Sequence, residues 1–532
     1  MSLPPQHPGQ NPMPVIAAPR PVLPDYVSLN AKWCGDKPAF ICGDEVLTWR
    51  AFSGRVNQVV RGLRTLGVTP RDHVGVVMDN SLAMAEIIWG IMAAGAAVVP
   101  LNTSISDEAM LAMLRDAGVR AVFASRAHVQ CVTAIQSQLA GLLPDASIAV
   151  EGAAPGWQDY SQWRAQFETG PLRVEVDPES TCNIIYSSGT TGQPKGIVHS
   201  HQRRLDWAGD LAIALRYTSA SVTLASIGMY SNIVWVGMLA TVISGGTIVI
   251  MPKFDARAAL ELIARHRITN TAMVPLQYDM MLAADDGQIG VSSITAMMSA
   301  GSPLWEDLKR NLIGRFGPTI IELYGLTEGL ITTLAPEDAA RKLSSVGKPV
   351  LGSDLRIVDD DGRDVPHGQT GEIVGLSRFV MDGYLNRPDA TNDAVLVDSD
   401  GRHWLKTGDL GKLDDEGFLY IVGRKKDLIL SGGQNIYPAD IEAVAIKHPD
   451  VADVAVIGVP HAKWGETPLA LIVARQSAAN EDEIRDWINA HVGKQQRISA
   501  VEFRAALPRN PNGKLLKAEL RAPYWSQTRS QA

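Results

Sequence analysis

The sequence predicts an α/β protein: a large N-terminal domain with parallel-type α/β subdomains and a small β subdomain, followed by a small α+β C-terminal domain. Three observations support this prediction. Strand-like and helical segments alternate from residue 71 to residue 274, which is the pattern of parallel sheets with crossover helices. Short strands separated by turns begin at Val346. A compact mixture of helices and strands begins near Lys425.

Length and composition limit the classes of protein to consider. A chain of 532 residues is too long for one hydrophobic core, so we expect at least two domains. Its 46% hydrophobic and 20% charged residues are typical of a soluble globular protein, and the net charge of -8 argues against binding to nucleic acid. The four cysteines lie far apart without a C-x-x-C pair. We therefore expect reduced thiols in a cytoplasmic protein at Cys34, Cys42, Cys131 and Cys182.

Two segments resemble targeting or membrane signals only superficially. Residues 1–24 are rich in Pro and Gln and have no basic start or apolar core, so we expect a disordered leader. Residues 233–251 carry no charge, but residues 244–247 interrupt them with Ser, two glycines and Thr before a β-branched run. This pattern favours a buried helix that leads into a buried strand, and we expect no integral membrane segment.

The N-terminal part should contain regularly alternating elements. Residues 25–64 are amphipathic and largely helical, and we expect the turn of a hairpin at residues 42–44. Apolar runs and helical periodicity then predict strands at 74–78, 96–100, 121–124 and 270–274, and helices at 81–93, 107–117, 203–215 and 256–266.

The predicted secondary structure of the C-terminal part falls into two regions. Acidic turns at residues 359–362 and 414–417 separate the short strands of the β subdomain. Beyond them we predict helices at 440–447 and 481–492 and strands at 451–459 and 469–474. We place the domain boundary between residues 424 and 425, which gives domains of residues 25–424 and 425–532.

The segment Tyr186–Gly196 has the composition of a phosphate-binding loop. It follows the apolar run 183–185, which is expected to end a buried strand. Its glycines permit positive φ angles and close backbone approach, its hydroxyls donate hydrogen bonds and Lys195 adds a positive charge. The spacing G-x-x-x-x-G-K-[ST] is absent, so this is not a Walker loop. A glycine-rich stretch alone would usually be an ordinary loop, and further motifs are needed.

Six further motifs follow the segment Tyr186–Gly196 along the chain. Taken singly, each has an ordinary explanation: a strand end, a capping aspartate, or a solvated lysine in a turn. They are Ser299–Leu304, Glu322–Glu328, Lys406–Asp409, Gly423–Asp427, Ser431–Pro438 and Pro508–Lys514.

Together, these motifs resemble the adenylate-forming superfamily, which contains acyl-CoA synthetases, adenylation domains and firefly luciferase. The resemblance extends from about Asp25 to Lys517, nearly the whole chain. It implies an AMP-forming carboxylic acid:CoA ligase that uses ATP, Mg²⁺ and coenzyme A. It also implies that the C-terminal domain is mobile and rotates about a hinge at Lys426.

The resemblance assigns roles to individual residues. Thr327 would contact the α-phosphate, Glu328 would hold Mg²⁺, and Lys514 would be the catalytic lysine that neutralises repulsion between carboxylate and phosphate. The residues implied in ATP binding are Ser187, Ser188, Gly189, Thr190, Thr191, Gly192, Lys195, Gly301, Ser302, Pro303, Glu322, Tyr324, Gly325, Asp409 and Arg424. Those implied in coenzyme A binding are Ser431, Gly432, Gly433, Trp464 and Arg497.

The implied acyl pocket has no charged side chain, which favours an acid with an uncharged tail. We expect a medium- or long-chain fatty acid; an aromatic acid of the benzoate or cinnamate type is the alternative. Ser231 replaces a histidine common in relatives, and Trp235 matches a gate tryptophan of fatty-acyl relatives, although a core tryptophan is equally compatible. The pocket residues are Tyr230, Ser231, Asn232, Trp235, Val274, Pro275, Tyr278, Ala300, Leu326 and Ile331.

Other functions remain to be distinguished. An adenylating enzyme could load a carrier protein in place of coenzyme A. A nucleotide-binding pseudoenzyme should lack Lys514, Glu328 or the Thr/Gly loop, and all of these are present. The resemblance also favours a homodimer.

Overall fold

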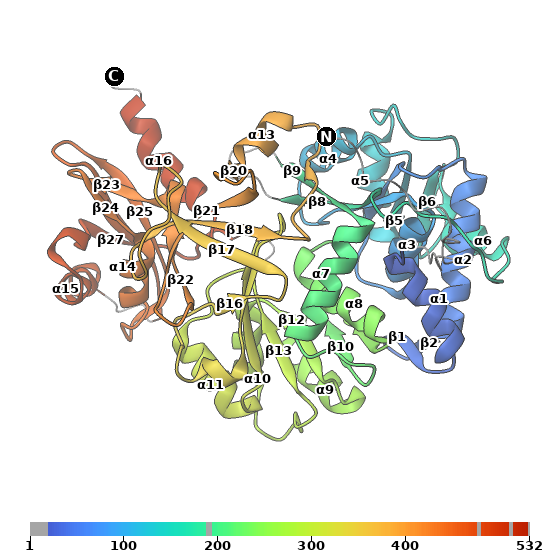
Figure 1. The fold of residues 1–532 in the computed structure, drawn as a ribbon, viewed down its shortest axis with the longest axis horizontal. Helices are drawn as coiled ribbons and strands as arrows, with labels where there is room; N and C mark the ends of the chain where they lie inside the picture. Colours follow the sequence, from blue (N-terminus) through green and yellow to red (C-terminus); the bar gives the residue numbers. More distant parts are fainter. Residues whose placement is uncertain (1–19, 188–193, 476–479, 510–513, 530–532) are drawn as a thin grey trace, which may run out of the picture.

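The computed structural model describes residues 20–187, 194–475, 480–509 and 514–529. The described strands form four sheets, of nine, eight, five and five strands. In Figure 1 the N-terminal segments lie on one side, the central segments below them and the C-terminal segments at the opposite end. The mixed α/β architecture, with a large N-terminal domain and a smaller C-terminal one, is confirmed.

An eight-stranded sheet forms the first unit of the N-terminal domain. Its six strands from β8 to β7 are parallel, whereas β9 and β19 extend it antiparallel at one edge. The strand order is β19 (Gly383–Tyr384), β9 (Lys195–Ser200), β8 (Thr181–Ser187), β4 (Ala97–Pro100), β3 (His73–Val77), β5 (Ala121–Ser125), β6 (Ser147–Val150) and β7 (Gln158–Asp159).

A nine-stranded sheet forms the second unit. Its central strands from β14 to β1 are parallel, and antiparallel strands close both edges. The order is β16 (Lys348–Pro349), β15 (Ile331–Leu334), β14 (Ile320–Gly325), β13 (Ala296–Ser299), β12 (Asn270–Met273), β10 (Val222–Ala225), β11 (Thr247–Ile250), β1 (Pro38–Cys42) and β2 (Glu45–Thr48). The predicted hairpin at residues 42–44 is the β1–β2 turn.

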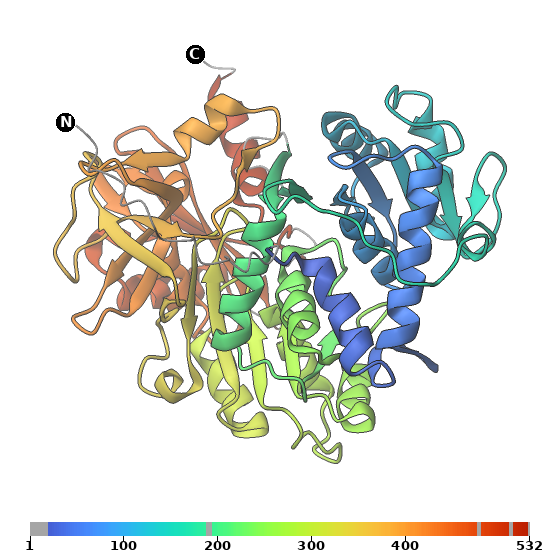
Figure 2. The same cartoon turned by 45° about the vertical axis from the view of Figure 1, so that its right-hand side comes forward.

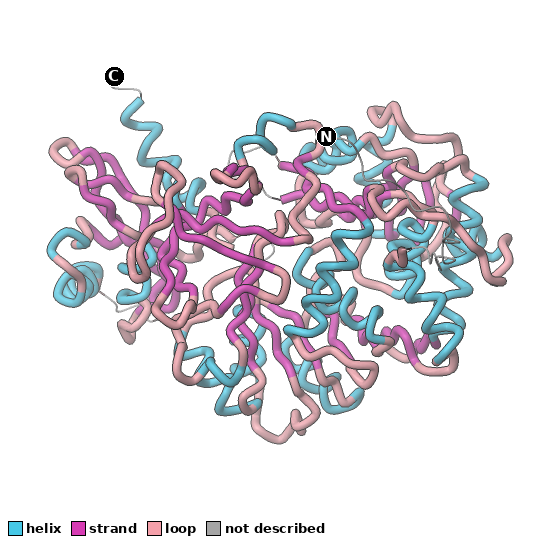
Figure 3. Tube along the Cα trace, in the orientation of Figure 1, coloured by secondary structure: helices cyan, strands magenta, loops and turns pink. Residues whose placement is uncertain are grey.

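Helices cover both sheets and join their cores. The turned view in Figure 2 separates the blue and teal unit from the rest, and the tube in Figure 3 shows helices outside the strands. One buried cluster contains side chains of both units. Its helices include α1 (Leu23–Trp33), α2 (Trp49–Thr65), α3 (Leu82–Ala93), α6 (Tyr160–Ala165), α7 (His201–Ala214) and α8 (Asn232–Ser244). The helices that pack elsewhere on the two units are α4 (Asp107–Ala117), α5 (Arg126–Gln136), α9 (Ala256–His266), α10 (Pro275–Ala284) and α11 (Glu306–Phe316).

Helix α8 explains the uncharged segment noted in the sequence. Residues 234–242 are all buried, so the helix is apolar all round. It ends at Gly245, whose φ of 71° is left-handed, and the chain then enters β11. The predicted helix-to-strand change is confirmed, and in the described part of the chain no helix has the length and hydropathy to cross a bilayer.

Helix boundaries follow local capping chemistry. Ser106 and Asp255 accept hydrogen bonds from Ala109 N and Ala258 N, and so begin α4 and α9. Gly118 in the left-handed conformation ends α4. The predicted ranges 107–117 and 256–266 coincide with these helices.

A small antiparallel sheet carries several functional residues. Strand β21 is long, and Asp409 on it pairs with Arg424 at the end of β22. The strands are β17 (Ser353–Val358), β18 (Gly371–Ser377), β20 (Val395–Val397), β21 (His403–Leu413) and β22 (Leu419–Arg424); helices α12 (Pro336–Ala339) and α13 (Pro388–Asp393) lie nearby in the chain.

The C-terminal domain has its own sheet and buried clusters. It occupies the orange-to-red end of Figure 1. Its elements are β23 (Ile429–Ser431), β24 (Gln434–Ile436), α14 (Pro438–Ala445), β25 (Val451–His461), β26 (Gly465–Ala474), α15 (Glu481–His491), β27 (Ala500–Phe503) and α16 (Lys517–Arg529). The leader prediction falls mostly on residues 1–19, outside the described residues, and its last two residues already begin α1.

Candidate active site

One cavity of about 440 Å³ lies where the two large sheets, the small β sheet and the C-terminal domain meet. Its polar end is lined by Ser187, Lys195, Thr327, Glu328, Tyr384, Thr407, Arg424 and Lys514. The rest of its wall is mostly apolar and is lined by Pro100, Leu101, Asn102, Ile105, Met113, Ile185, Tyr186, Trp207, Tyr230, Ser231, Asn232, Ile233, Val236, Ala300, Gly301, Leu323, Gly325, Leu326 and Ile331.

Asp409 connects the second large sheet to the small β sheet. The Tyr324 hydroxyl donates to Asp409 Oδ2 over 2.8 Å, and Arg424 Nε lies 3.3 Å from Asp409 Oδ1. Burial, followed by the negative charge of Asp409, raises the pKa of Tyr324 well above its ordinary value. The phenol is therefore neutral and remains a donor. The carboxylate has its position fixed by two partners, so it is suited to accept hydrogen bonds from a sugar.

Lys514 reaches the same cavity from the C-terminal domain. Burial, and then the positive charges of Arg424 and Lys426, lower its pKa to about 8 against the opposing effect of Asp409 and Glu328. The structure thus brings Lys514 together with Arg424, Asp409 and Glu328. These groups come from four separate sequence motifs.

Glu328 is held by a residue that the sequence did not single out. The Tyr384 hydroxyl donates to Glu328 Oε1 over 2.9 Å. The same tyrosine ring lies 4.7 Å from Lys195 Nζ, within cation–π range. Tyr384 pairs with Ile197 through β19 and β9, which fixes it beside the end of the phosphate-loop hairpin. Tyr384 therefore orders a carboxylate and an ammonium group at once.

The described ends of the phosphate loop face the polar end. Ser187 and Lys195 are paired across β8 and β9, and both line the cavity. The remaining predicted phosphate ligands, Ser188, Gly189, Thr190, Thr191 and Gly192, lie outside the described residues. His199, farther along β9, is hydrogen-bonded to the backbone of Thr327. Burial, and then the charge of Arg204, lower the pKa of His199 well below its usual value, so the imidazole is neutral.

The predicted adenine slot is only partly on the cavity wall. Gly301 and Gly325 line it, and a Cβ on Gly325 would lie 2.6 Å from the carbonyl oxygen of Leu330, so a larger residue would displace backbone. Ser302 and Pro303 are neighbours of Gly301 and are not among the lining residues. Glu322 points elsewhere: it is buried and paired with Lys309 at 2.6 Å, with its Oε1 accepting from Leu304 N. In this structure it stabilises the β14–α11 contact.

The predicted acyl pocket divides into two groups. Tyr230, Ser231, Asn232, Ala300, Leu326 and Ile331 line the cavity. Trp235 is fully buried behind the wall, where its Nε1 donates to Met229 O over 2.8 Å. Tyr278 is likewise a core residue that donates to Met298 O over 2.8 Å. Val274 and Pro275 also stand outside the described lining of this cavity, at the start of α10.

The residues predicted to bind coenzyme A lie away from this cavity. Gly432, Gly433, Trp464 and Arg497 are exposed, and Ser431 is partly exposed. Trp464 packs over Gly432, whose added Cβ would lie 2.8 Å from the indole ring. Lys426, the predicted hinge, lies in a short 3-10 helix after β22, and burial lowers its pKa. The structure therefore brings together part of the residues predicted to bind the nucleotide, and it leaves those predicted to bind coenzyme A at the surface of the C-terminal domain.

Sequence reasoning missed several wall residues. Tyr384 and Thr407 sit at the polar end, and Trp207 and Asn102 line the apolar part. The only sequence signal for Tyr384 is the glycine that precedes it in Asp382–Tyr384, a residue that the structure places at a φ of 144°. Trp207 gave no such signal, because its position on α7 looks like an ordinary core site.

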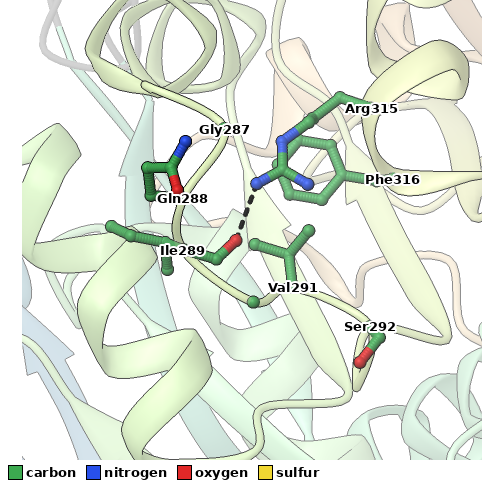
Figure 4. A pocket seen from close by; sticks show the side chains of 8 residues that line it. Gly287, Gln288, Ile289, Val291, Ser292, Arg315 and Phe316 are labelled. Atoms are coloured by element: carbon green, nitrogen blue, oxygen red, sulfur yellow. Dashed lines mark hydrogen bonds between the residues drawn. The ribbon is translucent and has the colours of Figure 1, made fainter.

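A second hollow of about 350 Å³ lies near the end of α11 (Figure 4). It is lined by residues 287–292 with Arg315 and Phe316. The Arg315 guanidinium is already used: it donates to Ile289 O over 2.8 Å and pairs with Asp285. This hollow offers a ligand no available charge, so it is a structural feature of the loop.

The fold and the cavity define an enzyme that holds a nucleotide beside an apolar pocket. The chain belongs to the family of AMP-binding enzymes, whose model matches residues 28–385; the model of the AMP-binding enzyme C-terminal domain matches residues 440–514. The resemblance to the adenylate-forming superfamily is therefore confirmed.

Individual relatives span nearly the whole chain. The long-chain-fatty-acid–CoA ligase FadD13 of Mycobacterium tuberculosis (strain ATCC 25618 / H37Rv) is 32% identical over 90% of this chain and 94% of its own. The indoleacetate–CoA ligase of Aromatoleum aromaticum (strain DSM 19018 / LMG 30748 / EbN1) is 32% identical over 94% and 97%. The crystal structure of the anthranilate CoA ligase AuaEII in complex with anthranoyl-AMP matches with a TM-score of 0.86 at 27% identity, covering 94% of this chain and 97% of that one.

Proposed function

We propose that this protein is an AMP-forming ligase that activates a carboxylic acid with ATP and transfers the acyl group to coenzyme A. One observation carries the proposal. Lys514, Arg424 and the Tyr324–Asp409 pair meet at one end of a cavity whose remaining wall is mostly apolar. Cations and a sugar acceptor at one end suit a nucleotide, and the apolar wall suits an acyl tail.

The first step needs charge neutralisation more than proton transfer. A carboxylic acid has a pKa of about 4.3, so it is already ionised at neutral pH. Its oxygen attacks the α-phosphorus of ATP, the bond to the bridging oxygen breaks, and pyrophosphate leaves with the electron pair. Lys514 is placed to reduce the repulsion between the two anions, and Lys195 with Ser187 would hold the departing phosphates. Thr327 would contact the α-phosphate.

At the polar end of the cavity, Mg²⁺ would need phosphate oxygens of the nucleotide as ligands in addition to protein donors. In the described parts of the chain no cluster of three or more His, Cys, Asp or Glu side chains could hold a metal ion. Glu328 is a single carboxylate at the cavity wall. A hard cation shared between one carboxylate and phosphate oxygens is a usual arrangement for Mg²⁺. We therefore propose Glu328 as its protein ligand, where the ion would neutralise phosphate charge.

The acid is proposed to have an uncharged tail. The sequence analysis favours a medium- or long-chain fatty acid, and FadD13 is named for long-chain fatty acids. An aromatic acid is the second candidate, because the indoleacetate and anthranilate ligases are named for aromatic acids and Trp207 and Tyr230 line this cavity.

Coenzyme A is the proposed acceptor in the second step. Its thiol would attack the acyl carbonyl and release AMP, which needs access that Lys514 occupies in this conformation. Rotation of residues 425–532 about Lys426 would withdraw Lys514 and bring the segment Ser431–Gly433 and Trp464 toward the adenylate. Arg497 is a proposed contact for the nucleotide phosphate of coenzyme A.

We also propose a cytoplasmic protein, because ATP and coenzyme A are intracellular substrates and all four cysteines are free thiols. A homodimer remains a proposal that the molar mass in solution tests.

The test is a coupled assay of AMP, ADP, pyrophosphate and acyl-CoA. Acids from butyrate to palmitate, benzoate and cinnamate are each supplied with ATP, Mg²⁺ and either coenzyme A or a phosphopantetheinylated carrier protein. We expect AMP, pyrophosphate and acyl-CoA in equal amounts for at least one acid. ADP as the product would overturn the proposal, and acyl transfer to the carrier protein alone would replace coenzyme A as the acceptor.

A further inference from the structure

The carboxamide of Asn232 lies in the cavity wall with no hydrogen-bond partner among the described residues. Its Oδ1 is buried and unpaired, and its Nδ2 makes no hydrogen bond to a described residue either. Buried polar groups in folded proteins are nearly always paired, and each exception calls for an explanation such as a bound ligand. A wall made only for an alkyl chain would be more stable with an aliphatic residue here.

A second polar group stands two residues away. Tyr230 lines the same cavity, and its hydroxyl has no described partner. Burial raises the pKa of Tyr230, so the phenol stays protonated and can donate. Its ring position depends on Gly228, because a Cβ there would lie 2.2 Å from Tyr230 Cε1.

The segment that carries both side chains is held in place by hydrogen bonds to Asn80 and by others within the segment. Asn80 donates to Ile227 O over 2.9 Å and accepts from Met229 N over 2.7 Å. Ser231 N donates to Gly228 O over 2.9 Å, and Ser231 Oγ accepts from Ile233 N at the start of α8. The backbone is therefore fixed before substrate binds, and the two polar groups are kept at the wall.

We propose that Tyr230 and Asn232 form a hydrogen-bonding subsite for a neutral oxygen substituent, a hydroxyl or carbonyl, on the tail of the acid substrate. The inference rests on the proposed function and defines its substrate class. The surrounding wall, with Leu101, Ile105, Met113 and Val236, is apolar, so a charged substituent would lack a partner. An acid without the substituent would leave both polar groups unpaired, and sites built in this way discriminate against such analogues.

Matched pairs of acids test the proposal. We would compare kcat/KM for AMP formation between 4-hydroxycinnamate and cinnamate, and between 8-hydroxyoctanoate and octanoate. One hydroxylated acid is expected to exceed its partner by about tenfold, which is the effect of one hydrogen bond. The pair that responds identifies an aromatic or an aliphatic frame. Equal kcat/KM values within both pairs would overturn the proposal.

Variants link the preference to the two residues. Asn232→Leu should bring the ratio close to one, because kcat/KM for the hydroxylated acid should fall relative to kcat/KM for the plain acid. Tyr230→Phe keeps the ring and should reduce the ratio, which gives a second reading if Asn232→Leu does not fold. Ser226→Ala is the matched control: Ser226 Oγ is also buried without a partner but is not part of the cavity wall, so the ratio should stay unchanged.

Different outcomes would contradict the subsite and the ligase activity. A ratio that survives in both Asn232→Leu and Tyr230→Phe would overturn the subsite and leave the ligase proposal standing. Absence of AMP formation with every acid, in the presence of coenzyme A, would overturn the ligase proposal and with it the subsite.

Discussion

The Tyr324 hydroxyl donates to the Asp409 carboxylate over 2.8 Å and so joins β14 of the second large sheet to β21 of the small β sheet. Arg424 lies on the other side of the same carboxylate at 3.3 Å. We expect Tyr324→Phe to raise KM for ATP about tenfold, because the acceptor loses one of its two partners while the aromatic face remains. Steady-state kinetics with ATP varied would measure this; an unchanged KM would show that Arg424 alone positions the carboxylate.

Lys514 should be needed for the first step only. Lys514→Ala is expected to slow pyrophosphate release on the order of a thousandfold, because a cation near the attacking carboxylate is lost. Conversion of a supplied acyl-adenylate to acyl-CoA should continue. The exposed Lys447 on the same domain provides the control, and Lys447→Ala should behave as the unchanged protein does. Normal pyrophosphate release by Lys514→Ala would refute the assigned role.

The pH dependence of the first step should reflect the ionisation of the Lys514 amine. Its pKa is lowered to about 8 by burial and by neighbouring cations, so the free enzyme loses the charged form as the pH rises through about 8. We expect kcat/KM for ATP to fall above that pH. The fall in kcat should come at higher pH, because bound phosphates favour the protonated amine. Lys514→Arg keeps its charge in this range and should lose the decline near pH 8, whatever its absolute rate. A flat kcat/KM profile between pH 7 and 9.5 would contradict the prediction.

Tyr384 should control how firmly Glu328 is held. Tyr384→Phe removes the hydroxyl that donates over 2.9 Å and keeps the ring beside Lys195, so we expect the apparent affinity for Mg²⁺ in the ATP complex to fall about tenfold. Tyr384→Leu also removes the ring and should weaken ATP binding measured in EDTA as well. Fluorescence titration with and without Mg²⁺ separates the two effects. Equal losses in both variants would mean that the hydroxyl has no separate role.

Lys426 should matter for the second step more than for the first. Proline at this position would restrict φ at the proposed hinge. We expect Lys426→Pro to leave adenylate formation largely intact and to slow thioester formation on the order of a hundredfold, since a misplaced domain misaligns the thiol. Single-turnover measurements of each half-reaction would decide; equal slowing of both counts against a hinge.

Regular elements were predictable where local signals agreed with tertiary packing. The helix α9 has an aspartate cap and an apolar face, and the sequence range matched it. The α8–β11 segment was also recognisable, because its glycines and β-branched residues reveal where the helix ends. The leader boundary was less accurate, since α1 already begins at Leu23.

The site was less predictable, because a motif does not say which way a side chain points. Glu322 belongs to the same motif as Tyr324, yet it turns inward to the buried Lys309, which lies on α11. Trp235 also turns into the core, where its Nε1 finds a backbone carbonyl. The lack of a hydrogen-bond partner for Asn232 Oδ1 could not be inferred from the sequence, because it depends on which donors the neighbouring elements place near it.

The positive groups around Asp409 have one further consequence. Arg424 and Lys426 lie close enough to Lys514 to lower its pKa together with burial, although Asp409 and Glu328 oppose them. Three cationic side chains therefore stand close together when no nucleotide is bound. Dissolved salt screens such charges over about 8 Å at physiological ionic strength, so polyphosphate affinity should decline as salt is added. Once pyrophosphate has left, repulsion from Arg424 and Lys426 also favours the departure of Lys514. Release of the first product would thereby promote the domain movement that the second step needs.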